Sequence, residues 1–171
     1  MMTVSESGLI FGPFPDDDCF LIEQSELYQR IQHGVAICEF ALIRQRQDST
    51  RVWLVEAKSS SPRPDNGVRF NEYIDEIKQK LSNALVLLLA ALLDRHTQGR
   101  STLPLAFQNL THREEFRLIL VINGHSDAWL VPVQEALQVA LRPLVRTFGL
   151  PGSAVIVLNE QTARLHGLVA E

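Results

Sequence analysis

The chain has 171 residues, 46% of them hydrophobic and 21% charged, which is typical of a single globular domain with a substantial core. Its net charge of −4 excludes a general nucleic-acid coat protein, which would carry a large basic excess, but it allows an enzyme with a local basic patch. The longest apolar run, Ala84–Leu93, is too short for a membrane span, which takes about 20 residues. We expect a cytoplasmic protein with two free thiols, because the N-terminus carries no signal pattern and Cys19 and Cys38 have no metal-ligand spacing.

The first third of the chain predicts one helix and two strands. Residues 1–20 contain glycines, prolines and an acidic triplet, and we expect an irregular lead-in. A helix is predicted over Ile22–Gln32 because its apolar residues share one face. Two segments rich in strand formers, Val35–Arg44 and Arg51–Lys58, follow, and the polar stretch at 45–50 predicts a hairpin turn between them.

The rest of the chain alternates between helix and strand. A proline-containing loop at 59–67 precedes the longest predicted helix, Asn71–Arg95, whose second half is almost wholly apolar. That apolar half predicts either burial in the core or a homodimer interface. After a polar loop at 97–113, the predicted elements are a strand at Phe116–Asn123, a helix starting at Pro132 and ending near Phe148, a strand at Ala154–Leu158 and a helical turn at Gln161–His166.

The order α-β-β-α-β-α-β predicts one α/β domain over residues 1–171 with a mixed central sheet flanked by helices. The apolar run Leu118–Ile122 does not alternate with polar residues, so its strand should be covered on both faces. The segment Asn123–Asp127 ends that strand at an edge where open sheets place ligands, although a turn at Gly124 explains it equally well.

The most informative motif is Glu56-Ala57-Lys58, at the end of an apolar strand. Residues two apart on a strand point to the same face, so Glu56 and Lys58 should project together from a segment that otherwise belongs to the core. Burying a carboxylate and an ammonium group is unfavourable unless they pair or bind something. The motif therefore predicts a site.

The hairpin supplies a second carboxylate. If the turn centres between Gln47 and Asp48, Glu39 lies opposite Glu56 on the neighbouring strand, with the two Cβ atoms about 5 Å apart. Two carboxylates so close repel unless a proton or a cation lies between them. Mg²⁺ prefers such oxygen ligands, and Lys58 on the same face would hold a phosphate oxygen or help to activate a water.

At these residues the sequence resembles the PD-(D/E)XK nuclease-like superfamily, which has the restriction-endonuclease-like fold. That family carries an acid on one strand and Glu-x-Lys on the next, followed by a helix. The resemblance covers about residues 26–95 and implies that Glu39, Glu56 and Lys58 are catalytic, with Glu39, Glu56 and Glu26 as metal ligands. It implies hydrolysis of phosphodiester bonds in nucleic acid, with DNA favoured and Mg²⁺ or Mn²⁺ as cofactor. The chain departs from the family in having Glu at position 39 and little room for a first strand, which would be missing or supplied by residues 8–11.

Several alternatives remain open from the sequence. Basic residues near the motif predict either a rim that contacts phosphates or a solvated helix face; they are Arg63, Arg69, Lys78 and Lys80. The protein is either an active nuclease or a catalytically inactive descendant of the fold that serves as an interaction module. A third reading is an unrelated α/β domain whose Glu-Ala-Lys is accidental.

Overall fold

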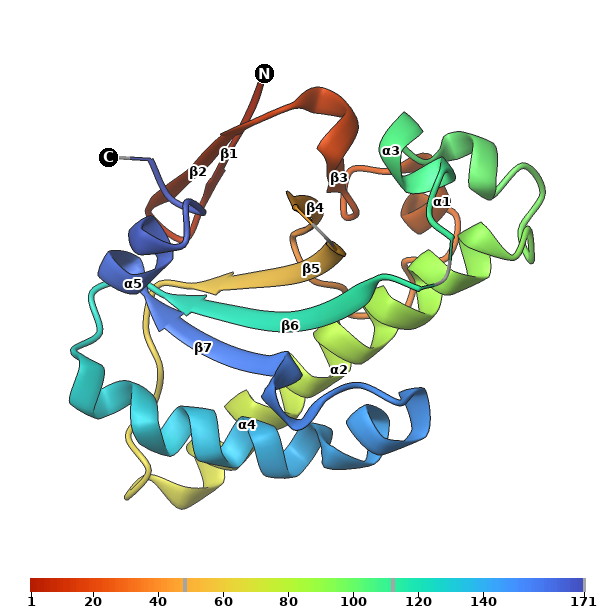
Figure 1. Cartoon of the computed structure of the whole chain (residues 1–171). Coiled ribbons are helices and arrows are strands. Elements are labelled where there is room, and N and C mark those ends of the chain that lie inside the picture. The colour runs from red at the N-terminus through yellow and green to blue at the C-terminus, as the bar shows by residue number, and fades with distance from the viewer. Residues whose placement is uncertain (48, 112, 171) are drawn as a thin grey trace.

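The computed structural model describes residues 1–47, 49–111 and 113–170, and a five-stranded mixed sheet lies at its centre (Figure 1). The strands, in spatial order, are β3 Cys19–Leu21, β4 Phe40–Arg46, β5 Ser49–Lys58, β6 Glu115–Ile122 and β7 Val155–Asn159. Strands β3, β4 and β5 are successively antiparallel, whereas β5, β6 and β7 are parallel. The predicted α/β class with a mixed sheet is confirmed.

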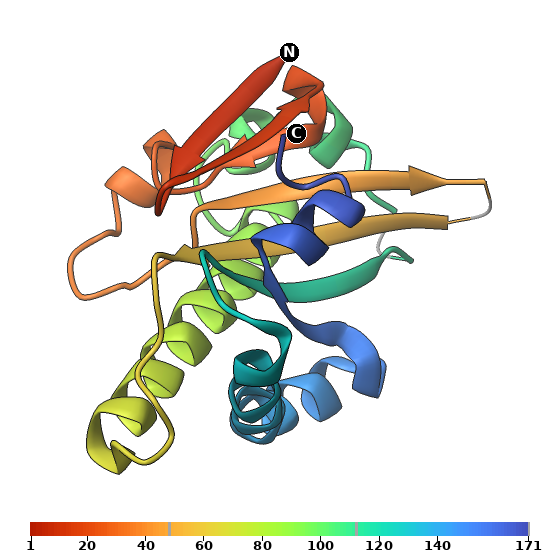
Figure 2. The same cartoon turned by 90° about the vertical axis from the view of Figure 1, so that its left-hand side faces the viewer.

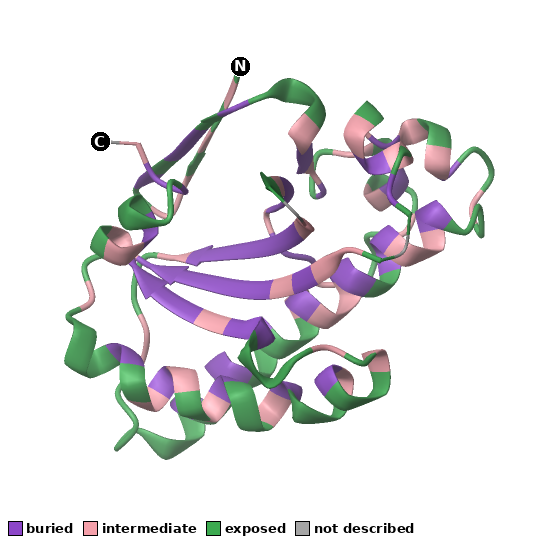
Figure 3. Ribbon diagram, viewed as in Figure 1, coloured by how far each residue is buried: buried purple, intermediate pink, exposed green. Residues whose placement is uncertain are grey.

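Two long helices, α2 Gly67–Leu92 and α4 Asp127–Phe148, cover one face of the sheet (Figure 2). Side chains alternate along the strands, so that Leu54 and Leu118 pack towards these helices while Val55 and Ile119 pack on the opposite side. The central strands are buried along most of their length (Figure 3). The sheet is therefore covered on both faces, as the unbroken apolar run predicted.

The opposite face is covered by a β-hairpin, which corrects the expectation of an irregular lead-in over residues 1–20. Strands β1 Met2–Glu6 and β2 Leu9–Phe14 pair antiparallel, and α5 Glu160–Leu165 lies beside them. Ser7 and Gly8 form the two-residue turn with φ of 51° and 78°, the positive values that hairpin turns favour. The glycine at this turn indicated a loop in the sequence, but it is what closes the hairpin.

The first helix is much shorter than predicted, since α1 covers only Glu26–Gln29. It begins there because the Ser25 hydroxyl accepts a hydrogen bond from the Tyr28 backbone N–H at 3.1 Å. Residues 35–39, predicted as strand, precede β4. The third antiparallel strand beside β4 is β3, not residues 8–11, which belong to the separate hairpin.

Helix α4 begins five residues before Pro132, so the predicted start at that proline is wrong and Pro132 and Pro143 both lie within the helix. The polar loop at 97–113 contains α3 Leu105–Gln108, and the predicted order lacked this helix as well as strands β1, β2 and β3. Three 3₁₀ turns complete the described elements, at Asp16–Asp18, Arg100–Thr102 and Gly152–Ala154. Other boundaries lie within a few residues of those expected.

The apolar half of α2 is largely part of the core of the chain. Ala84, Leu85 and Leu88 are buried, whereas Val86 and Leu93 are exposed. Burial within one chain thus accounts for most of this apolarity, and a homodimer stays a prediction. No helix in the described part of the chain is long and apolar enough to cross a membrane.

Candidate functional site

The hairpin of β4 and β5 has the register that the sequence predicted. Phe40 pairs with Val55 and Gln45 pairs with Thr50, although Asp48 at the turn lies outside the described residues. Glu39 lies just before β4, and its backbone N–H donates to the Val55 carbonyl at 3.1 Å. The chain therefore still runs beside β5 at Glu39, although β4 begins one residue later, at Phe40, and Glu39 was expected to lie within the strand.

Glu56 is the buried centre of a charged cluster. It lies in β5 on the side that faces α2, and its side chain has no exposed surface. Its Oε1 accepts a hydrogen bond from Lys80 Nζ at 2.8 Å and lies 3.4 Å from Lys58 Nζ. Its other oxygen, Oε2, is buried without a hydrogen-bond partner among the described residues. Glu56 and Lys58 thus project together, and half of this carboxylate is left unsatisfied.

Glu39 joins the same cluster through Lys80. Its side chain is only 12% exposed, and Oε1 lies 3.8 Å from the Lys80 ammonium that contacts Glu56. Burial, followed by the negative charge of Glu56, raises the pKa of Glu39 to about 7. Burial also raises the pKa of Glu56, although the hydrogen bond and charge of Lys80 oppose the shift. The pair therefore holds a proton more readily than isolated carboxylates, as two such groups do at close range.

Helix α2 supplies three residues whose place in this cluster the sequence did not reveal. Tyr73, Glu76 and Lys80 are three and four residues apart and so lie on one face of the helix. Glu76 Oε1 accepts a hydrogen bond from Lys58 Nζ at 2.6 Å. The Tyr73 hydroxyl is buried without a hydrogen-bond partner among described residues, and burial, then the charge of Glu56, raises its pKa.

The spacing of these three residues, which places them on one face of a helix, was the only feature of the sequence that indicated a shared position. Lys80 was predicted to contact nucleic acid, and instead it donates to the central carboxylate. Burial alone would lower the pKa of Lys80, but its hydrogen bond and charge interaction with Glu56 outweigh this effect and leave the pKa raised. Lys80 is therefore a cation held by the protein's own carboxylates.

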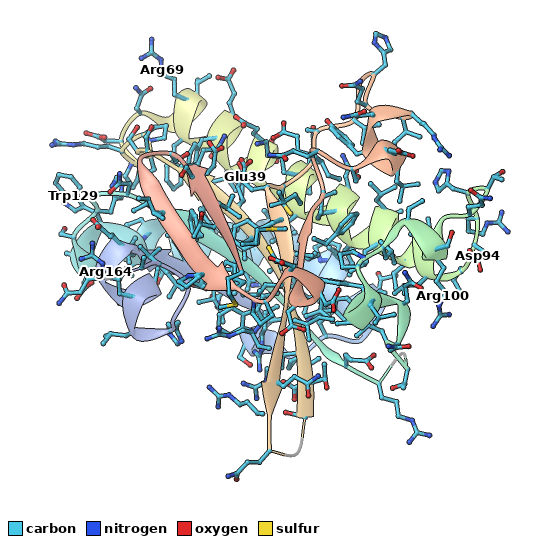
Figure 4. All side chains as sticks on the ribbon, turned by 90° about the horizontal axis from the view of Figure 1, so that it is seen from above. Glu39, Arg69, Asp94, Arg100, Trp129 and Arg164 are labelled. Carbon is cyan, nitrogen blue, oxygen red and sulfur yellow. The ribbon has the colours of Figure 1, made fainter. Side chains whose placement is uncertain are left out.

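The remaining predicted residues lie elsewhere. Glu26 is exposed on α1, where its carboxylate pairs with Arg30 at 3.5 Å. The Arg63 guanidinium lies over the Trp129 ring, 5.5 Å from its centroid. In Figure 4, Arg69 and Trp129 lie towards one end of the molecule, whereas Glu39 lies nearer the middle. The structure therefore brings Glu39, Glu56, Lys58 and Lys80 together, but it adds neither Glu26 nor the two arginines to that cluster.

Two carboxylates of this cluster, Glu39 and Glu56, lie beside Lys80, and the third, Glu76, accepts from Lys58. The described residues contain no group of three or more His, Cys, Asp or Glu side chains that would hold a metal ion. Mg²⁺ commonly binds through one or two carboxylates and keeps several waters or takes substrate phosphate oxygens. The unpartnered Glu56 Oε2 and the neighbouring Glu39 carboxylate are oxygen donors of that kind.

Comparison with protein-family models, with curated proteins and with solved structures finds nothing that matches this chain. The family of the protein is thus not established by similarity, and the chemistry of the cluster has to be inferred from its geometry and charges.

Proposed function

We propose that the protein is a divalent-metal-dependent nuclease-like phosphodiesterase that uses Glu39, Glu56 and Lys58. The observation that carries this proposal is the Glu56 carboxylate, which is fully buried and has one oxygen without a hydrogen-bond partner in the described structure. Burying a carboxylate oxygen without a partner costs free energy, and a cation that binds this oxygen would offset the cost. A second carboxylate and two lysines beside it supply the groups that phosphodiester hydrolysis requires.

The chain's own residues have separable roles in this proposal. Glu39 and Glu56 would hold Mg²⁺ or Mn²⁺, which when bound supplies charge to the scissile phosphate and lowers the pKa of a water. Lys58 is 23% exposed and bonds Glu76, a half-exposed residue that can move into solvent. Lys58 is thus able to exchange this carboxylate for a phosphate oxygen and to stabilise the charge that develops there. Burial raises the pKa of Glu56, and the hydrogen bond and charge of Lys80 oppose this shift, so Lys80 favours the ionised carboxylate.

One observation favours a second candidate, a nuclease-like fold without catalysis that acts as an interaction module. The ammonium group of Lys80 already lies between Glu39 and Glu56, at 3.8 and 2.8 Å, where a shared cation would be expected. In that case the cluster is a buried ion network that stabilises one arrangement of β5 against α2, and it requires no metal.

Cleavage assays with the full chain separate the two candidates. Single-stranded and duplex DNA are incubated with Mg²⁺, with Mn²⁺ or with a chelator, and products are followed on gels. We expect metal-dependent cleavage by the parent and a loss of about 100-fold or more for Glu56→Gln and Lys58→Met. Manganese titration by calorimetry should show binding to the parent and none to Glu56→Gln.

Matched substitutions on the exposed face of α2 serve as controls. Glu72→Gln and Lys78→Met make the same chemical changes outside the cluster and should cleave like the parent. A parent that neither cleaves nor binds manganese would support the interaction module. Equal cleavage by Lys58→Met and the parent would remove Lys58 from the mechanism.

A further inference from the structure

A pocket separate from the carboxylate cluster lies between the loop after β5 and the start of α4. Its volume is about 490 Å³, within the range of small-molecule sites. The residues that shape it are Pro62, Arg63, Pro64, His125, Trp129 and Pro132. Prolines on both sides of Arg63 restrict the loop, so the pocket is largely formed before any ligand binds.

Trp129 gives this pocket its chemical character. The residue is 55% exposed, although the indole is among the largest apolar surfaces a side chain offers. The His125 ring packs edge-on against it, with centroids 5.6 Å apart, and the Arg63 guanidinium lies over the indole. An accessible aromatic ring beside a guanidinium is the combination that binds a nucleobase by stacking and its phosphate by charge.

Neighbouring contacts hold the His125 ring in place. Ser61 Oγ and His125 Nε2 are hydrogen-bonded at 2.6 Å, and the His125 backbone carbonyl accepts from Asn159 Nδ2 at 3.0 Å. The same Asn159 amide donates to Asp127 in the first turn of α4 at 2.8 Å. The indole thus packs against a histidine whose ring and backbone are each held by one hydrogen bond, so Trp129 provides a preorganised surface.

The pocket and the carboxylate cluster share one edge of the sheet. Ser61 follows Lys58 by three residues, which places their Cα atoms within about 11 Å of each other. His125 likewise follows the end of β6 by three residues. A strand whose phosphodiester lies at Lys58 would therefore bring a base one or two nucleotides away to this pocket.

We propose that this pocket binds one nucleotide of a single strand, with its base stacked on Trp129 and its phosphate held by Arg63. A base within a duplex is stacked and paired and cannot enter, so the pocket selects single-stranded nucleic acid or an unpaired end. The inference rests on the proposed function in one respect, since it takes the bound strand to be the one that reaches Glu56 and Lys58. Binding itself requires neither metal nor cleavage.

Tryptophan fluorescence of the full chain tests this inference directly. The chain has two tryptophans, and Trp53 is only 7% exposed, so quenching by a ligand reports on Trp129. Oligothymidylate in chelator-containing buffer should quench the parent, and Trp129→Leu should lose this response. Anisotropy of the labelled oligonucleotide should show binding at least about 10-fold weaker for Trp129→Leu and for Arg63→Ala.

Two exposed positions on α4 provide matched controls. Val139→Ala removes an exposed apolar side chain and Arg142→Ala removes an exposed guanidinium, and both should bind the oligonucleotide like the parent. Circular dichroism of each variant excludes unfolding as the cause of a loss. Arg63→Lys, which keeps the charge, should recover part of the affinity.

Three results would overturn the inference. They are unchanged oligonucleotide affinity in Trp129→Leu and Arg63→Ala, equal affinity for blunt duplex, and no binding by the parent. Thymidine monophosphate that binds as tightly as the oligonucleotide would indicate a site for free nucleotides instead of a strand. A parent that binds through Trp129 but never cleaves contradicts the proposed function alone, whereas cleavage with unchanged variants contradicts the pocket alone.

Discussion

Glu56 is the residue on which the charged cluster depends. Its buried carboxylate has two lysines on one oxygen and no partner among the described residues on the other, so it is only half satisfied. Networks of this kind stabilise a fold when every member is paired and are costly when one is not. The unpaired Glu56 Oε2 is thus the position where a bound cation would add most.

The pH dependence of stability should report on Glu39. Its pKa is about 7 in the folded chain and 4.5 in the reference state, so folding favours its protonated form. The stabilising contribution is therefore fully present below pH 4.5 and is lost as the pH rises through 7. As the pH rises from about 5 to about 8, we expect the free energy of unfolding of Glu39→Gln to increase by roughly 1–2 kcal/mol relative to that of the parent. Urea unfolding at each pH measures this difference.

Glu72→Gln on the exposed face of α2 is the control for this measurement, and it should follow the pH profile of the parent. An identical profile for Glu39→Gln and the parent would show that Glu39 is solvated and does not share a site with Glu56.

The sequence predicted the cluster residues that lie on or beside the strands, but it did not predict that residues of α2 join them. The common face of Glu56 and Lys58 follows from the two-residue repeat of a strand, and the register that brings Glu39 alongside follows from the position of the hairpin turn. Tyr73, Glu76 and Lys80 share a helix face, but their period does not say which face of α2 meets β5. That choice is made by the tertiary packing.

Among the elements, the hairpin of β1 and β2 is tied to the sheet edge where the cluster lies. The Ser7 hydroxyl donates to the Ala57 carbonyl at 3.1 Å, and Asn123 Nδ2 donates to the Ser7 carbonyl at 3.1 Å. Ala57 lies in β5 between Glu56 and Lys58, and Asn123 directly follows the end of β6. The hairpin turn therefore braces the strand ends that present the cluster.

Substitution of the glycine in this turn tests the bracing. Gly8 has φ of 78°, and an added Cβ would lie 2.8 Å from Asn123 Nδ2, the atom that bonds Ser7. We expect Gly8→Ala to combine backbone strain of about 1–2 kcal/mol with loss of this hydrogen bond, about 1 kcal/mol more. Urea unfolding measures the total.

Gly34→Ala is a matched control because Gly34 also has a positive φ, of 72°, but an added Cβ would contact nothing within 4 Å. Gly34→Ala should therefore show the backbone strain without the loss of a hydrogen bond. Equal destabilisation of the two variants would mean that the contact between Gly8 and Asn123 carries no energy.

The elements that the sequence missed are those that local signals describe poorly. Strand β3 has three residues, too few to show a period. Strands β1 and β2 were missed because glycines with positive φ indicated a loop: Gly8 lies in the turn, and Gly12, with φ of 99°, lies within β2. The longer elements β5, α2, β6 and α4 were found because a periodic or unbroken apolar pattern within a segment of eight or more residues is a strong signal.

The charge distribution of the whole molecule determines which parts of its surface attract the phosphates of a nucleic acid. The cluster contains three carboxylates, Glu39, Glu56 and Glu76, against the ammonium groups of Lys58 and Lys80, and the chain as a whole carries −4. Without a bound cation this region offers little attraction for phosphates. Of the residues predicted to contact nucleic acid, Arg63 and Arg69 are exposed outside the cluster and would contact a strand, whereas Lys80 is paired with carboxylates.

Salt dependence of binding should therefore be shallow. Each phosphate neutralised on a single strand adds about −0.7 to the slope of log affinity against log salt concentration, so two arginines predict a slope of about −1.4 without metal. Arg63→Ala and Arg69→Ala should each reduce the slope by about 0.7, whereas Lys80→Met should change it little because carboxylates neutralise Lys80. Anisotropy titrations of oligothymidylate at several salt concentrations measure these slopes. A parent slope steeper than about −4 would require an extended basic surface and would contradict the view that only a few cations guide the strand to the site.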